Sequence, residues 1–315
     1  MAVNVLPVAP RGAALNRGLC RAVGSAACKW LRFPWGLFCL ARWDAMTDAG
    51  TIDVLHRNNV TVSGNPTGPT LVFAHGFGCS QETWSLVAPQ LEPDHRVVLF
   101  DHIGAGGSDA SGYDAKKYRT LDGYATDVLE ILDALDASEV VFVGHSVSAM
   151  IGVLAANRVP SRFAALILIG PSPRYVNADG YRGGFEQADI DALLDSLDAN
   201  YVGWSRQTAP MIMGNPDRPE LGRRLADSFC RLDPVIAGQF AKVTFLSDNR
   251  EDLARVTVPT LVLQCRTDAI APTEVGDYVH ASITGSRLVV LDATGHVPIL
   301  SAPDQVVREI REFLS

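Results

Sequence analysis

The chain has 315 residues, of which 47% are hydrophobic and 20% charged, and its formal net charge is −8. These values are ordinary for a globular enzyme with one large domain or two small ones. The acidic residues are spread along the chain, so the charge gives no reason to expect nucleic acid as a partner.

The cysteines form neither a CxxC pair nor the spacing of a zinc site. We interpret them as free thiols and predict a cytoplasmic protein, because the cytoplasm keeps thiols reduced. No pattern indicates a metal or an organic cofactor. The six cysteines are Cys20, Cys28, Cys39, Cys79, Cys230 and Cys265.

Residues 1–45 differ from the remainder, because they hold six basic residues and one acidic residue, Asp44. Their apolar stretch is interrupted by Arg32 and Pro34 and is too short to span a bilayer. An organelle transit peptide fits the basic composition better than a secretory signal does. We favour a third interpretation, that Met46 is the true start and that the first 45 residues are upstream reading frame. We therefore predict an extension over 1–45 and a folded domain over 46–315.

The folded part opens with IDVLHRNNVTVSG, which predicts two strands joined as a hairpin at residues 57–59. A buried strand is predicted over 70–74 and is followed by His75-Gly76-Phe77-Gly78. Residues 80–92 are typical of a helix with Ser80 as its N-cap. Next come a strand over 95–100, a glycine-rich loop over 101–109 and an amphipathic helix over 121–135.

A serine stands between a buried strand and a helix in the segment VVFVGHSVSAM, residues 140–150. This pattern is typical of the nucleophile elbow of α/β-hydrolases, in which a tight turn lifts the serine hydroxyl above the sheet. The usual motif is G-x-S-x-G, and Ser148 replaces its last glycine. The alternative interpretation is that Ser146 only caps the helix.

A strand over 165–169 follows, and then the pattern changes, because residues 184–243 contain helical segments and no convincing strand. Strands return over 260–264 and 287–291, and a helix is predicted over 304–313. Strands that alternate with helices predict a mostly parallel, doubly wound sheet. The helical insertion is expected to cover a binding crevice at the carboxyl ends of the strands.

A serine hydroxyl needs a base, and the base needs an orienting carboxylate. Asp268 follows one predicted strand and His296 follows the next, so the chain order is Ser146, Asp268, His296. This is the order in α/β-hydrolases. We predict these three as the catalytic triad, with the backbone N–H groups of Phe77 and Val147 as the oxyanion hole. Three other histidines are interpreted as structural: His75, His102 and His145.

Several segments resemble the RsbQ group of bacterial stress-signalling hydrolases and the plant karrikin and strigolactone receptors: GHSVSAMIG, GPSPRYVN, GGFEQADIDALL, NYVGW, NPDRPEL, DPVIAGQFAKVTFLSDNREDL and VPTLVLQC. The resemblance runs from about Ile52 to the C-terminus. It implies an α/β-hydrolase fold with a four-helix, V-shaped lid over an apolar pocket. By position, that pocket includes Phe77, Val147, Phe185, Trp204 and Phe245. Thr208 stands where the plant receptors usually have phenylalanine, and Ile299 replaces a histidine.

We weigh three functions. The first is a serine hydrolase that makes or senses a small hydrophobic signal, whose partner in the bacterial branch is a PAS-domain phosphatase that activates a stress sigma factor. The second is a metabolic esterase or lactonase without a signalling partner. The third is a ligand-binding protein with little turnover. We expect a small hydrophobic ligand, no nucleic acid and no membrane as partners.

Overall fold

The computed structural model describes residues 31–33, 36–38 and 53–315. Within the first 52 residues it describes only two short strands, β1 (Leu31–Phe33) and β2 (Gly36–Phe38), which pair antiparallel. The predictions for residues 1–45 and for a start at Met46 otherwise lie outside the described residues.

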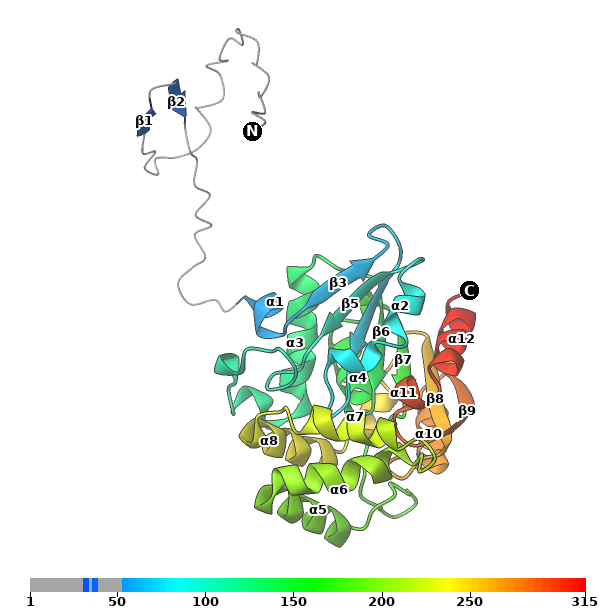
Figure 1. Ribbon diagram of the computed structural model, residues 1–315. Coiled ribbons are helices and arrows are strands. Elements are labelled where there is room, and N and C mark those ends of the chain that lie inside the picture. The colour runs from blue at the N-terminus through cyan, green and yellow to red at the C-terminus, as the bar shows by residue number, and fades with distance from the viewer. Residues whose placement is uncertain (1–30, 34–35, 39–52) are drawn as a thin grey trace, which may run out of the picture. The chain divides into compact units, whose positions relative to one another are not determined.

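The folded part is built on a seven-stranded sheet with the order β3-β5-β4-β6-β7-β8-β9. Only β3 runs antiparallel to its neighbour, and the other pairs are parallel, which confirms the predicted mostly parallel sheet. Figure 1 shows the strands side by side through the centre of the molecule. They are β3 (Thr61–Gly64), β4 (Thr70–Ala74), β5 (Arg96–Phe100), β6 (Val140–His145), β7 (Phe163–Ile169), β8 (Thr260–Thr267) and β9 (Arg287–Thr294).

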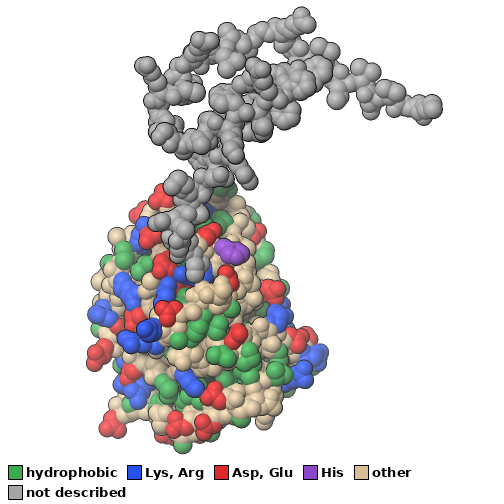
Figure 2. All heavy atoms as spheres, turned by 90° about the vertical axis from the view of Figure 1, so that its left-hand side faces the viewer, with side chains coloured by type: hydrophobic (Ala, Val, Ile, Leu, Met, Phe, Trp, Pro, Cys, Tyr) green, Lys and Arg blue, Asp and Glu red, His purple; other side chains and the backbone are tan. Residues whose placement is uncertain are grey.

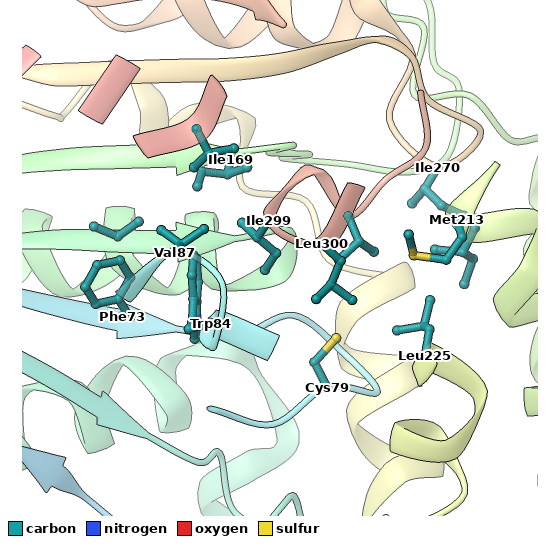
Figure 3. Close-up of a cluster of buried hydrophobic side chains, with 14 of the residues drawn as sticks. Phe73, Cys79, Trp84, Val87, Ile169, Met213, Leu225, Ile270, Ile299 and Leu300 are labelled. Carbon is teal, nitrogen blue, oxygen red and sulfur yellow. The ribbon is translucent and has the colours of Figure 1, made fainter. Parts of the chain in front are cut away.

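The central strands are buried on both faces, which explains their continuous apolar runs. Side chains alternate between the two faces of a strand. Leu71 and Phe73 therefore belong to one hydrophobic core, while Val72 and Ala74 belong to another. Figure 3 shows part of the first core, where Phe73, Trp84 and Val87 lie together and Ile299 and Leu300 come from the chain near the C-terminus.

Helices cover both faces of the sheet, as expected for a doubly wound fold. The predicted helix over 121–135 is α3, and the predicted C-terminal helix is α12. Side chains of α3, α4 and α10 enter the second core, while those of α2, α11 and α12 enter the first. The helices outside the insertion are α1 (Val54–Arg57), α2 (Ala88–Leu91), α3 (Leu121–Ala134), α4 (Val147–Arg158), α9 (Arg250–Leu253), α10 (Thr273–Ser282), α11 (Pro298–Ser301) and α12 (Pro303–Leu314), with 3-10 turns η1 (Gln81–Trp84), η2 (Ala110–Gly112), η3 (Lys117–Arg119) and η4 (Pro160–Arg162).

The predicted helical insertion consists of four helices that follow β7 and precede the short helix α9 and β8. They stand together at one end of the sheet in Figure 1, in green and yellow. We call α5–α8 the lid. Its helices are α5 (Gln187–Ala199), α6 (Tyr201–Met213), α7 (Pro219–Phe229) and α8 (Pro234–Phe245).

The predicted hairpin at the start of the domain is wrong. Residues 54–57 form the short helix α1, capped by the Asp53 carboxylate, and only β3 is a strand. The Arg57 guanidinium is buried and binds Asp127 and Glu130 of α3 at 2.9 and 2.7 Å. This ion pair fixes α1 against a helix that is distant in sequence, so local strand propensity does not decide the conformation.

The predicted helix over 80–92 is also divided, into η1 and α2. Ser80 precedes η1, but its side chain makes no capping hydrogen bond. Pro89 lies in the first turn of α2, where its missing N–H costs nothing, so it favours a new helix start at this point.

Charge is mixed on the face drawn in Figure 2, where basic and acidic side chains are interspersed. No helix among the described residues is long and apolar enough to cross a membrane.

Candidate active site

The turn after β6 holds Ser146 in an unusual backbone conformation. Its φ of 58° and ψ of −125° are sparsely populated by residues other than glycine. The Ser146 N–H donates to the Ile169 carbonyl at 2.8 Å, which fixes the turn to the neighbouring strand. A Cβ at Gly144 would lie 2.4 Å from the backbone carbonyl oxygen of Ser148, so only glycine fits there. The Ser146 side chain makes no capping hydrogen bond, which removes the interpretation as a simple helix cap.

Ser146, His296 and Asp268 form one hydrogen-bonded chain. His296 Nε2 lies 2.8 Å from Ser146 Oγ, and His296 Nδ1 lies 2.8 Å from Asp268 Oδ2. All three residues stand at the carboxyl ends of strands, on the turns after β6, β8 and β9. The structure therefore brings together residues that are up to 150 positions apart in the sequence.

The Asp268 carboxylate is buried and well satisfied. Its Oδ1 accepts from the N–H groups of Ile270 and Ala271 at 2.8 and 3.1 Å. Burial by itself raises the pKa of Asp268, but His296 and these N–H donors outweigh it and hold the pKa below its ordinary value. Because an ionised carboxylate only accepts, His296 carries its proton on Nδ1. The lone pair on Nε2 then faces the Ser146 hydroxyl.

The backbone of His296 is held from two sides. Its N–H donates to the Ile212 carbonyl of lid helix α6 at 2.9 Å, and its carbonyl accepts from His145 Nε2 at 2.8 Å. Burial, and then the charge of His296, lower the pKa of His145 to about 3, so His145 is neutral at physiological pH. The loop before His296 also abuts the lid, since a Cβ at Gly295 would lie 1.8 Å from the Met213 oxygen.

The two predicted oxyanion donors lie on either side of Ser146. Val147 is the first residue of α4, where an N–H has no partner one turn back. Phe77 lies in the loop after β4. This loop passes next to the serine, since a Cβ at Gly76 would lie 3.1 Å from Ser146 Cβ. Their joint role as an oxyanion hole stays a prediction.

A cavity of about 30 Å³ adjoins Ser146 beneath the lid. It is far smaller than common ligand pockets of roughly 300 Å³ or more. A ligand larger than a water molecule therefore requires lid or side-chain movement. The lining is mostly apolar and comprises Phe77, Cys79, His145, Ser146, Tyr175, Ile212, Leu225, Phe229, Thr244, Phe245, Ile270, His296 and Val297.

The structure corrects the predicted pocket in part. Phe77 and Phe245 line the cavity, whereas Val147, Phe185 and Trp204 do not. Phe185 is half-buried and pairs through its backbone with the segment around Val176. Trp204 stacks on Phe229 with a centroid separation of 5.7 Å, and Phe229 itself lines the cavity. Trp204 thus supports the cavity wall from behind.

We therefore expect Trp204→Ala to act on stability and not on specificity. Replacing a packed tryptophan by alanine typically costs about 3–5 kcal/mol, and Trp204 is only 6% exposed. Chemical denaturation should show this loss. Preference among ester chain lengths should stay unchanged in the fraction that remains folded. A stable variant with a relaxed preference for ester chain length would show that Trp204 lines the pocket after all.

Several cavity residues were not predicted from the sequence, and two of them, Tyr175 and Thr244, carry hydroxyl groups. The Tyr175 ring is buried, and this burial raises the pKa of its hydroxyl, while the nearby Ser146 side chain opposes the increase. Thr244 of α8 is 1% exposed, and its Oγ1 has no hydrogen-bond partner among the described residues. The position of Tyr175 in the sequence gave one indication of its role. It closely follows the end of β7, and β7 lies beside β6, the strand that precedes Ser146.

The described residues contain no group of three or more His, Cys, Asp or Glu that would hold a metal. Cys79 adds a thiol to the cavity wall, but burial raises its pKa to about 11, so it stays protonated.

Comparisons with known proteins agree with this geometry. Residues 71–309 match the profile described as the alpha/beta hydrolase family. A strigolactone esterase of Arabidopsis thaliana is 39% identical over 264 residues, which cover 83% of this chain and 98% of that protein. A karrikin insensitive 2 receptor of Petunia hybrida is 38% identical over 259 residues, covering 82% of this chain and 95% of the relative.

A solved structure is similar as well. A hydrolase from Oleispira antarctica has a TM-score of 0.81 and 40% sequence identity, and the match covers 83% of this chain and 96% of that chain. These matches support the plant half of the resemblance inferred from the sequence. The resemblance to the RsbQ group stays a prediction.

Proposed function

The chain belongs to the alpha/beta hydrolase family, and we propose that it is a serine hydrolase that cleaves small ester or lactone substrates. The observation that carries this proposal is the buried Ser146–His296–Asp268 chain, with 2.8 Å at each of its two links. Relatives named as esterases support the same reaction class.

In the proposed mechanism, His296 Nε2 takes the Ser146 proton as Oγ attacks the substrate carbonyl carbon. The carbonyl oxygen becomes an oxyanion that accepts hydrogen bonds from the Phe77 and Val147 N–H groups. The positive end of the α4 dipole, at Val147, stabilises its charge further. The C–O bond to the alcohol then breaks, and His296 gives its proton to the departing oxygen. Water repeats these steps on the acyl-enzyme, releases the acid and restores Ser146.

The substrates proposed are small and uncharged. The cavity wall consists mainly of side chains such as Phe77, Phe229 and Phe245, and burying a charge among them is costly without a partner. Short acyl esters should therefore be hydrolysed faster than long or charged ones. A panel of p-nitrophenyl esters measures this preference, and equal rates for acetyl and succinyl esters would contradict it.

A second candidate, a small-molecule sensor with slow turnover, is favoured by the small cavity and by relatives named as receptors. A cytoplasmic location is proposed for either candidate, and a PAS-domain phosphatase is proposed as the partner of a hydrolase that serves signalling. Steady-state hydrolysis of p-nitrophenyl acetate separates the two, because a sensor acylates once and then deacylates slowly. Mass spectrometry would then detect a persistent acyl group on Ser146.

Thr244 should favour ester substrates whose acyl group carries an additional oxygen. Its hydroxyl is buried in the cavity wall and unpaired among the described residues, so an ether oxygen in the acyl group gives it a partner. A net hydrogen bond contributes about 1 kcal/mol. We expect Thr244→Val to lower the ratio of methoxyacetyl to butyryl ester hydrolysis roughly fivefold.

The two acyl groups are nearly the same size, so the change in their ratio isolates the oxygen. Thr208→Val is the matched control, since Thr208 is also buried but does not line the cavity. An unchanged ratio in Thr244→Val, or an equal change in both variants, would exclude recognition by Thr244.

A further inference from the structure

Ser148, the residue that departs from the G-x-S-x-G motif, makes two buried hydrogen bonds. Its Oγ donates to the His75 carbonyl at 2.5 Å and lies 2.7 Å from His102 Nε2. His75, His102 and Ser148 are all fully buried. They follow β4, β5 and β6, which are neighbours in the sheet, so the contacts join three strand ends.

The direction of each hydrogen bond follows from its partners. A carbonyl only accepts, so the single Ser148 proton goes to the His75 oxygen, and His102 Nε2 must be the donor to Ser148. Burial, and then the charge of His75, lower the pKa of His102 far below its ordinary value, so this ring is neutral. Its proton is therefore on Nε2, and Nδ1 is the buried atom that has no partner among the described residues.

The same reasoning fixes His75. Its Nε2 accepts from the His102 backbone N–H at 3.1 Å, so its proton is on Nδ1. Nδ1 then donates to the Gly76 carbonyl at 2.9 Å. The Cys79 N–H donates to this carbonyl as well, at 3.2 Å.

These contacts control the orientation of one particular N–H group. The Gly76 carbonyl and the Phe77 N–H belong to the same planar trans peptide, in which they point in opposite directions. Holding the carbonyl toward His75 therefore turns the Phe77 N–H the other way. Ser148 holds the preceding peptide by its carbonyl, so two successive peptide planes of this loop are fixed by side chains of the network.

We propose that Ser148 and His102 are positioning residues for the oxyanion hole, acting through His75 to aim the Phe77 N–H. Neither touches the substrate. This inference rests on the proposed function, because it assigns a support to that site. It also gives the serine in the fifth motif position a role that glycine lacks, since only a hydroxyl bridges the His75 carbonyl and the His102 ring.

The test is Ser148→Ala, compared with Ser205→Ala as a matched control. Ser205 is also fully buried on a helix and donates one hydrogen bond, to the Tyr201 carbonyl, but it lies in the lid. Removing an oxyanion donor lowers kcat by about 10²–10³. We therefore expect a misoriented Phe77 N–H in Ser148→Ala to lower kcat roughly tenfold to a hundredfold. KM should change little, and Ser205→Ala should retain wild-type kcat.

A second readout separates positioning from general damage. Sulfur accepts hydrogen bonds more weakly than oxygen, so an intact oxyanion hole favours an ester over its thionoester (C=S) analogue. Ser148→Ala should shrink this ratio severalfold. His102→Gln, which keeps an N–H donor, should retain more kcat than His102→Leu.

A Ser148→Ala enzyme with wild-type kcat and an unchanged ester-to-thionoester ratio would overturn the proposal. Equal losses in Ser148→Ala and Ser205→Ala with an unchanged ratio would overturn it too. Failure of the proposed function is distinct, because it would appear as turnover that survives in Ser146→Ala.

Discussion

Replacing Ser146 by alanine is expected to lower ester turnover by about 10⁴-fold or more, the usual result of losing the nucleophile of a triad. The Ser146 hydroxyl lies 2.8 Å from His296 Nε2, and the Cys79 thiol of the cavity wall stays protonated. The fold should remain intact, because the Ser146 backbone hydrogen bond to Ile169 does not involve the side chain.

The measurement is kcat with p-nitrophenyl acetate, together with labelling by a fluorophosphonate, which should disappear. Ser172→Ala is the matched control, since Ser172 is also buried but bonds to the Arg174 carbonyl outside the cavity. Retention of more than about a tenth of wild-type turnover by Ser146→Ala would refute the assigned nucleophile.

Asp268→Asn should have the second largest effect, a loss of about 10⁴-fold in kcat, as expected when the histidine is held in the wrong tautomer. An amide has two unfavourable orientations here. If its NH₂ faces His296 Nδ1, that nitrogen must accept, so the proton moves to Nε2 and the base cannot take the Ser146 proton. If its NH₂ faces the other way, it meets the Ile270 and Ala271 N–H groups.

The substitution should also alter stability in acid. The pKa of Asp268 is lowered in the folded state, below its ordinary value of 3.8. Its carboxylate therefore stabilises the fold above about pH 4, and this contribution is lost as the pH falls through the folded-state pKa. The difference in Tm between the wild type and Asp268→Asn should shrink between about pH 5 and pH 2.

Asp292→Asn serves as the control for both measurements. Its side chain is 85% exposed on β9 and pairs with Arg266 at the surface, so we expect almost no change in kcat or Tm. Wild-type activity in Asp268→Asn would show that another carboxylate orients the base.

The site residues were accessible from the sequence because parallel strands place their carboxyl ends at one edge of a sheet. Ser146, Asp268 and His296 each follow a predicted strand, so their proximity required only the sheet itself. The lid was predictable for a related reason. Strand patterns occur before and after residues 184–243, but not within them. Both inferences use local periodicity and topology, and the triad also uses the chain order of α/β-hydrolases.

Neighbours within the cavity depend on tertiary packing, which periodicity does not specify. Trp204 and Phe229 are both aromatic residues of lid helices, yet only Phe229 faces the cavity and Trp204 stacks behind it. Thr244 is one residue before Phe245 and lines the same wall. The short helix α1 was missed for a similar reason, because the buried Arg57 finds its partners on α3.

The hydrogen bond between the Ile212 carbonyl and the His296 N–H joins lid helix α6 to the residue that acts as the base. Any motion that withdraws the end of α6 from the sheet must break this bond and release the histidine loop. Substrate and product must therefore enter and leave by another route. Otherwise the reaction stops while the end of α6 is withdrawn. A genetic screen for lost turnover would accordingly recover changes at Gly214 and Gly295, since a Cβ at Gly214 would lie 3.3 Å from the Gly295 Cα, although neither glycine meets the substrate.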